Sequence, residues 1–334
     1  MNPAALSLLA AMRTDLGDLE TKSGYPDLAL GHYEAATELD RRVREIDPVR
    51  AEWRFNWATN SASVAQAALL LGDYALARAR IEPARTELAD LVASEPDNVR
   101  WLQNLSFVDG CVCLVAMATG DLEGGTSSCD RVVATTRSEL EKDPATAHAA
   151  ANQAIAETSL AAIALLQGRP AAARTEARRA VDLAMAWNQK RPGEPDWLRI
   201  LADAELRLAY AERHVGAARV ALAAVAGLGE ADIESVLATM RADIAVGDLG
   251  DDDEALRRVL ALGERARTLW PRVVPIQGEL ARAELVLAAR AGAAEAAGLR
   301  QQAAALIEPL DRRGALDAEL RAELGLHRNV DSSR

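Results

Sequence analysis

Glycine recurs in this chain at a fixed interval, and the interval constrains the fold more than any other feature of the sequence. Successive members of the series are 48 residues apart: Gly24, Gly72, Gly120, Gly168 and Gly216. Proline keeps the same interval at Pro48, Pro96, Pro144 and Pro192. A fixed period of this length indicates a repeat array, in which each unit buries its apolar surface against the next unit.

Each unit reads as a pair of helices, because glycine permits the left-handed turn after a first helix and proline ends a second one. The segments between these marks have helical periodicity. One second helix spaces its small and apolar residues by three or four positions, at Ala173, Ala177, Ala180, Ala184 and Trp187. Only 4% of the residues are aromatic although half are hydrophobic, which suits closely packed helices better than a β-sandwich. The pattern predicts an all-α chain of antiparallel helix pairs.

Two further series share this register near the start of the first helices. Tryptophan occupies one position at Trp53, Trp101 and Trp197, where the fourth unit has Ala149. We interpret these side chains as packing between consecutive repeats, in preference to aromatic platforms for a ligand. The second series is Asn56, Asn104 and Asn152. A ladder of amides can bind an extended peptide backbone, but the same amides can also tie neighbouring loops together.

The interval changes after Gly216. The next matching glycine, Gly250, lies 34 residues further on, and another unit turns at Gly292. A short segment, Leu316–Leu326, is charged on one side, and we expect it to cap the last pair. The chain is therefore expected to form about seven helix pairs plus a C-terminal cap in one continuous solenoid. The expected division is five long pairs over residues 1–227, then two shorter, irregular pairs and the capping helix over residues 228–334.

Some units depart from the pattern. Gly124 and Gly125 stand where the third unit begins its second helix. We expect that helix to fray or to start late, because glycine weakens a helix by roughly 1 kcal/mol relative to alanine. Pro83 and Pro309 lie inside expected helices, and they predict kinks because proline removes a backbone donor.

The segment Gly72–Ala77, with the sequence Gly-Asp-Tyr-Ala-Leu-Ala and followed by Ile81 and Ala84, resembles the core signature of tetratricopeptide repeats. The resemblance implies a right-handed superhelical solenoid. The usual repeat has 34 residues, so a 48-residue unit adds about two turns to each helix. This long form looks like repeats of bacterial multidomain proteins that also carry kinase, nucleotide-binding or winged-helix modules. Other units echo the signature with Ala29, Tyr33 and Ala36; Ala173, Ala177 and Ala180; Ala255; and Ala297 and Ala304.

In tetratricopeptide proteins the first helix of each pair lines the concave surface, where partner peptides commonly lie. An apolar centre flanked by Arg199, Tyr210 and Arg213 would suit a peptide with a hydrophobic anchor and acidic residues. Alternatively, the apolar residues of this face fill a tighter superhelix. The face that the resemblance implies is lined by Phe55, Thr59, Gln66, Gln103, Phe107, Leu114, Met117, Ile155, Thr158, Arg199, Asp203, Tyr210 and Arg213.

Motifs of the common enzyme classes are missing from the sequence. It has no glycine-rich phosphate loop, no His-Glu-x-x-His zinc motif, no paired CxxC and no serine nucleophile elbow. We expect no catalysis, no metal site and no cofactor, and a helical enzyme with a dispersed active site is the least favoured alternative. The histidines are expected to have surface or packing roles, because they are scattered over different repeats: His32, His148, His214 and His327.

Charge and cysteine content indicate the surroundings. The net charge of -12 and the pI near 5.0 oppose nucleic-acid binding, which relies on basic side chains. Cys111, Cys113 and Cys129 form an odd number without paired spacing, so a reducing cytoplasm is the simplest location. The apolar stretch Ala4–Met12 lacks a basic leader, and we expect no later run of membrane-spanning length.

Two functions are consistent with these features. The first is a cytoplasmic scaffold that binds a protein or peptide along its concave face. The second is a sensory or regulatory module that binds a small ligand within a larger protein. Ala5 stands where later units have tryptophan, which is compatible with a fragment of such a protein. Self-association through an end repeat is a further expectation.

Overall fold

Helices make up the array throughout the part of the chain that the computed structural model describes, residues 2–230 and 232–323. No strand occurs within these residues. The first four pairs are α1 (Pro3–Ser23) with α2 (Pro26–Ile46), α3 (Ala51–Leu70) with α4 (Tyr74–Ser94), α5 (Val99–Thr119) with α6 (Leu122–Lys142), and α7 (Ala147–Leu166) with α8 (Pro170–Lys190). The rest are α9 (Pro195–Glu212), α10 (Val215–Val225), α11 (Ile233–Gly250), α12 (Asp253–Leu269), α13 (Val274–Ala288), α14 (Ala293–Arg312) and α15 (Ala318–Glu323). The expected seven pairs and short final helix are confirmed.

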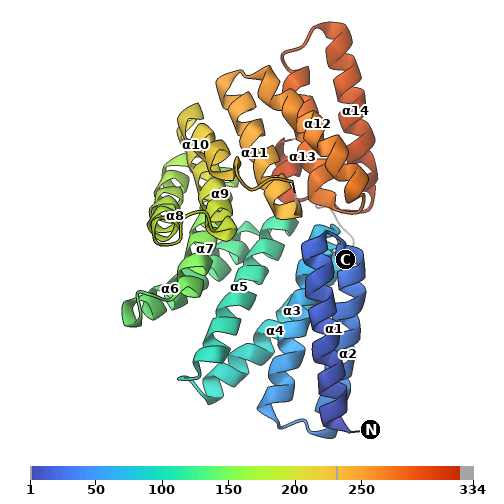
Figure 1. The fold of residues 1–334 in the computed structure, drawn as a ribbon, viewed down its shortest axis with the longest axis vertical. Helices are drawn as coiled ribbons and strands as arrows, with labels where there is room; N and C mark the ends of the chain where they lie inside the picture. Colours follow the sequence, from blue (N-terminus) through green and yellow to red (C-terminus); the bar gives the residue numbers. More distant parts are fainter. Residues whose placement is uncertain (1, 231, 324–334) are drawn as a thin grey trace.

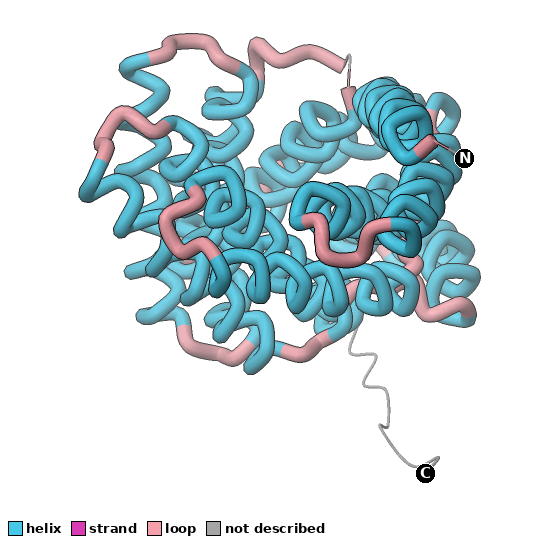
Figure 2. Tube along the Cα trace, turned by 90° about the horizontal axis from the view of Figure 1, so that it is seen from below, coloured by secondary structure: helices cyan, strands magenta, loops and turns pink. Residues whose placement is uncertain are grey.

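The pairs stack in chain order into a curved solenoid (Figures 1 and 2). Each helix from α1 to α13 packs against the next, and the odd-numbered helices from α3 to α13 also pack against one another. The first helices of the pairs therefore form an inner layer, and the second helices cover it from outside. This is the arrangement that the resemblance to tetratricopeptide repeats implies.

Glycine ends the first helix of each of the four regular pairs. Gly24, Gly72, Gly120 and Gly168 all have positive φ, which glycine adopts without a Cβ penalty. The fifth member of the series differs from the prediction. Gly216 lies inside α10, and the turn before it is made by Arg213 at a φ of 52°. Gly216 therefore keeps the 48-residue interval of the sequence, but the turn between α9 and α10 lies at Arg213 and not at this glycine.

Two glycines in α6 and one proline each in α4 and α14 were expected to disturb these helices. α6 begins at Leu122 and runs through Gly124 and Gly125, so the predicted late start is wrong. Asp121 explains the early start, because its carboxylate caps the helix by accepting a hydrogen bond from the backbone N–H of Gly124. Pro83 and Pro309 lie inside α4 and α14, and both helices continue past them.

Small residues of the second helices pack against the inner layer as predicted. Ala173, Ala177, Ala180 and Ala184 in α8 have no exposed surface, and Trp187 at the end of this stripe stacks on Trp197 of α9. The tryptophan series lies in the core, which supports its interpretation as packing. In α14 the buried alanines are Ala296 and Ala303, so the register predicted from Ala297 and Ala304 is wrong by one position.

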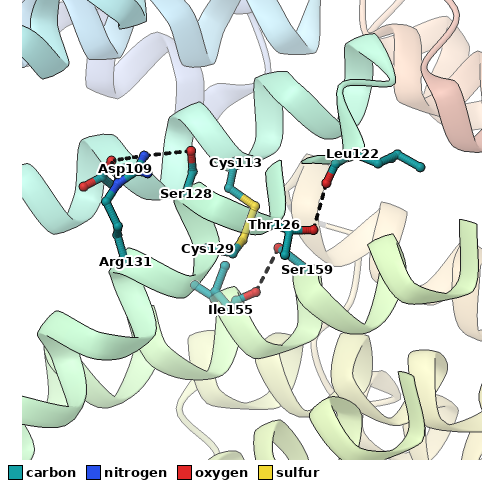
Figure 3. The surroundings of a disulfide bond; sticks show 9 residues. All are labelled: Asp109, Cys113, Leu122, Thr126, Ser128, Cys129, Arg131, Ile155 and Ser159. Carbon is teal, nitrogen blue, oxygen red and sulfur yellow. Dashed lines mark hydrogen bonds and ion pairs between the residues drawn. A yellow bond between two sulfur atoms is a disulfide. The ribbon is translucent and has the colours of Figure 1, made fainter. Parts of the chain in front are cut away.

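A disulfide joins Cys113 of α5 to Cys129 of α6, contrary to the expectation of unpaired cysteines (Figure 3). The two cysteines lie on facing helices of one pair, and sequence spacing does not reveal this. Cys111 stays free and buried. A disulfide is typical of an oxidising compartment, so the cysteine count no longer supports a reducing cytoplasm.

Two inner helices, α5 and α7, are long and apolar enough to cross a membrane by length and composition. The expectation that no run reaches that length is therefore wrong. Both helices pack between neighbours in the array, where core helices of soluble proteins pass the same test. The apolar window of α7 is 67% buried within the array, and that of α5 is 39% buried.

The two ends of the solenoid meet across its opening (Figure 1). The indole Nε1 of Trp270, after α12, donates to the carbonyl of Ser23 at 3.3 Å. Arg272 forms an ion pair with Asp27 of α2 at 3.1 Å. The segment after α14 also turns back, because the hydroxyl of Tyr74 donates to the carbonyl of Ala315 at 3.1 Å. These contacts tie the last repeats to the first ones.

Candidate functional site

The inner layer holds a cavity among α9, α11 and α13, which we call the inner cavity. α9 contributes Asp203, Arg207 and Tyr210, whose spacing of four and three residues places them on one helix face. Residues 315–320 close one side of it. The remaining lining comes from Tyr74, Leu206, Arg241, Val274, Pro275, Gly278, Glu279 and Arg282.

Ion pairs connect the charged groups of the inner cavity. Arg207 of α9 pairs with Glu319 of α15. Nε of Arg241 lies 2.7 Å from Oε1 of Glu279, and Arg282 reaches the other oxygen of Glu279 at 3.7 Å. Arg282 also lies over the ring of Tyr210, 5.5 Å from its centroid. These contacts therefore join the inner helices α9, α11 and α13 to residues 315–320, the segment that turns back after α14.

Two carboxylates of the inner cavity, Glu319 and Asp203, have shifted pKa values. Burial alone would raise the pKa of Glu319, but Arg207 and Arg282 outweigh it and hold the pKa at about 2. Burial raises the pKa of Asp203, and this shift is only partly offset by Arg241 and Arg207. Glu319 is therefore the carboxylate whose charge the arginines stabilise most clearly.

An apolar wall adjoins these charges. Leu206 and Val274 of the inner helices contribute to it, and Leu320 of residues 315–320, which is only 8% exposed, packs in the same core cluster as Val274. Gly278 of α13 leaves room for this leucine, since a Cβ there would lie 3.1 Å from Cδ2 of Leu320. The cavity thus places an apolar pocket beside a cluster of arginines.

The predicted face is only partly reproduced around this cavity. Asp203 and Tyr210 line it, whereas Arg199 forms ion pairs with Asp232 and Glu234 that tie α9 to α11. Arg213 is exposed in the turn after α9. Arg199 therefore has a structural role, Arg213 lies outside the cavity lining, and a different group of arginines lines the cavity.

Apolar candidates on the earlier inner helices fall into two groups. Leu114 and Ile155 are 39% and 42% exposed on the neighbouring helices α5 and α7. Phe107 and Met117 are half-buried, and they pack against core clusters. Phe55 is buried with the guanidinium of Arg100 over its ring, so its predicted place on the partner-facing surface is wrong.

The polar candidates of α3, α5 and α7 are mostly engaged near their own positions. The hydroxyl of Thr59 donates to backbone carbonyls of α3, and that of Thr158 donates to the carbonyl of Ala154. Gln66 is exposed and contacts the thiol of Cys111. Gln103 is half-buried.

The predicted amide ladder is likewise engaged within single helices. Asn104 donates to the carbonyl of Arg100 at 2.9 Å, and the amide of Asn152 lies 3.5 Å from the ring of His148. Asn56 is half-buried in α3. The local partners of Asn104 and Asn152 favour the structural interpretation of the series.

Several site residues were not predicted. Arg207 follows Asp203 by one helical turn, so the face of α9 contained a signal for it. Arg241, Glu279 and Glu319 join the site only because α11, α13 and α15 converge, and no local spacing reveals that. Another missed series is Asp109, Glu157 and Glu205, which are 48 residues apart and buried. Asp109 accepts hydrogen bonds from Arg85 and from Arg131, and Figure 3 draws the contact with Arg131. Both contacts indicate a structural role.

Metal chemistry has no evident site in the described part of the chain, where no group of three or more His, Cys, Asp or Glu side chains is arranged to hold an ion. His214 caps α10 by accepting from the N–H of Gly216, and His32 contacts Arg13. His327 lies outside the described residues.

Comparison with known proteins finds similarity in structure alone. No family model matches the sequence, and no curated protein matches it either. A solved structure does resemble it: the Rap conjugation gene regulator of the plasmid pLS20 in complex with a Phr peptide. The TM-score is 0.60 at 13% sequence identity, over 90% of this chain and 74% of that one. The likeness is one of fold. It supports a helical-repeat solenoid, but membership of the tetratricopeptide family stays an expectation.

Proposed function

We propose that this chain binds a peptide, or an extended segment of a partner protein, on the inner surface of its solenoid. One observation carries the proposal: residues 315–320 of the chain itself cross this surface and contact it through a backbone carbonyl, a carboxylate and a leucine side chain. A surface that holds a segment in this way has the features needed to hold a peptide. The structural neighbour was solved with a peptide, which adds support by analogy.

The proposed activity is binding without turnover. Three arginines of the inner cavity pair with Glu279 and Glu319, and their arrangement suggests recognition of charge. A second candidate is a regulatory module whose bound state controls another protein or an attached domain. The description of the structural neighbour as a conjugation gene regulator favours this alternative.

Partner capture with mapping tests the first function. The purified chain is used as bait, the captured proteins are identified, and peptides from them are added back during hydrogen exchange. We expect protection of amides in α9, α11 and α13. R241Q removes a cavity charge, and R265Q is the control because Arg265 pairs with Glu230 at an exposed position of α12. Equal capture and protection with R241Q and R265Q would place the binding site elsewhere.

Self-association remains a separate proposal. Leu8, Met12 and Leu19 of α1 are more than half exposed, and Leu9 and Leu16 are 43% and 44% exposed. A second copy presents the same face and can pack against it symmetrically. Light scattering across a concentration series tests this: M12E should abolish any dimer, and a monomeric wild type at every concentration would refute the proposal.

A further inference from the structure

The segment that follows α14 enters the interior of the solenoid by a defined turn. Gly314 has a φ of 72°, and this turn redirects the chain from the outer helix α14 toward the inner cavity. Ala315 and Leu316 then pack with Ile307 and Leu310, and so they cap the last pair. Asp317, Glu319 and Leu320 follow and line the cavity, which Ala315 and Leu316 also line.

Residues 317–320 make contacts that a separate peptide is also able to make. Asp317 caps the short helix by accepting from the backbone N–H of Leu320 at 2.7 Å. Glu319 then pairs with Arg207, while Leu320 fills the space left by Gly278. The segment therefore presents one carboxylate and the next leucine from a single turn of helix.

Charge favours an acidic occupant at this place. The inner helices contribute three arginines, Arg207, Arg241 and Arg282, against two carboxylates, Asp203 and Glu279. The wall is thus more basic than acidic in a chain whose net charge is -12. An arginine paired with a carboxylate in a partly desolvated cavity gives a charge-assisted contact, and a lost partner leaves a buried charge uncompensated.

We infer that residues 317–320 are an internal ligand, which occupies the site of an acidic peptide with a glutamate followed by leucine. A partner peptide with this chemistry displaces the segment and takes over the pairing with Arg207. The inference rests on the proposed function and deepens it, because it names the class of peptide and a competition that sets its apparent affinity.

The test uses a fluorescent synthetic peptide with the sequence of residues 313–323, added to the full chain. In the released variant, E319Q with L320A, the internal ligand is weakened while the cavity wall is intact. The matched control is E308Q with L269A, because Glu308 and Leu269 are exposed on other parts of the array. Fluorescence anisotropy measures the affinity of the peptide for each protein.

The peptide is expected to bind the released variant at least tenfold more tightly than it binds the wild type or the control. The same peptide carrying the E319Q change should lose most of this affinity. Equal affinity for wild type and released variant would overturn the internal competition, and so would the absence of binding to the released variant.

Hydrogen exchange of the wild type covers the case in which the released variant does not fold. Excess peptide should accelerate exchange at amides 317–323 while α9 and α13 stay protected, and unchanged exchange overturns the inference. Peptides from the captured partner proteins then distinguish failure of the internal-ligand inference from failure of the proposed function. If they still protect α9, α11 and α13 while leaving residues 317–323 in place, the proposed function stands and the internal ligand is refuted. If no peptide protects the inner helices, both fail.

Discussion

The first four helix pairs and the last three differ in regularity. α1 to α8 have 20 or 21 residues each, and their pairs turn at glycines with positive φ. α9 to α14 vary from 11 to 20 residues, and two of their turns place Arg213 and Asp251 in the left-handed region. The charged inner cavity lies among the irregular helices. Regular repeats thus act as a frame, and the departures from the repeat coincide with the candidate site.

The two regions also contact each other at the turns of the regular region. A Cβ on Gly24 would clash with Nε1 of Trp270, and one on Gly72 would lie 2.7 Å from Cβ of Ala315. A Cβ on Gly168 would meet no atom within 4 Å, although its backbone conformation is similar. Identical turn glycines therefore differ in whether they help to close the solenoid.

Substituting alanine for Gly168 and for Gly24 distinguishes the cost of backbone strain from the cost of lost contact between the two ends of the solenoid. These substitutions have the largest expected effect on the free energy of unfolding. G168A should lower the free energy of unfolding by about 1 kcal/mol, because only the left-handed conformation is penalised. G24A should cost roughly 3 kcal/mol or more, since a clash with the buried Trp270 adds to the same penalty. Urea denaturation of both variants measures the difference. Equal losses would mean that contact between the ends contributes little to stability.

The disulfide gives the regular region a constraint of its own. Cys113 and Cys129 are separated by 16 residues, and closing a loop of this size stabilises a fold by about 3 kcal/mol in the chain-entropy model. C113A with C129A should therefore cost roughly 2–3 kcal/mol in urea denaturation. A reductant should destabilise the wild type and the control C111A, but not the double variant. A wild type that is insensitive to reductant in the unfolding transition would contradict this expectation.

The fold followed from the sequence wherever one local rule repeated. Glycine at a fixed interval, together with buried alanines at helical spacing, was sufficient for the regular pairs. Prediction failed at Gly216 because the turn moved to Arg213, whose left-handed conformation carries no signal in the residue type. Prediction also failed at the cysteines, because the pairing of Cys113 and Cys129 depends on how two helices face each other.

The candidate site was less predictable than the fold, because helices that are far apart in the sequence come together to form it. Asp203 and Tyr210 were found because they share a helix face that the repeat defines. Arg241 and Glu319 belong to helices far apart in the sequence, which meet only when the solenoid curves and the segment after α14 turns inward. Phe55 was misplaced because it packs in a core cluster with residues of α4 and α5, and Arg100 covers its ring.

Buried carboxylic acids occur in both regions. In the regular region, Asp40 allows the effect of such an acid on the free energy of unfolding to be measured. Burial raises the pKa of Asp40 to about 6, although a hydrogen bond from Asn60 opposes the shift. The folded pKa lies above the ordinary value of 3.8, so the folded state favours the protonated acid. Stability should fall as the pH rises from about 4 through about 6.

D40N removes this titration and should stabilise the chain on the order of 1–2 kcal/mol at pH 8, with little effect at pH 4. Thermal and urea unfolding across this range measure the change. D90N is the control, because Asp90 is an exposed residue of α4 and its substitution alters the net charge equally. A pH dependence that is the same in D40N and D90N would show that Asp40 does not carry the expected cost.

Arg213 lies at the border between the two regions, where the smallest effect is expected. Its φ of 52° is unfavourable for a residue with a Cβ, while its backbone N–H still donates to the carbonyl of Ala209. R213G restores the residue type of the regular turns, and it should stabilise the chain by about 0.5–1 kcal/mol because the relief of strain exceeds the entropy that glycine adds to the unfolded state. R213A is the matched control, since it removes the same side chain but keeps the Cβ. If urea denaturation shows the same stability for R213G and R213A, the irregular turn costs no backbone strain, and the irregular region differs from the regular one only in helix length and in the charges that it places inside.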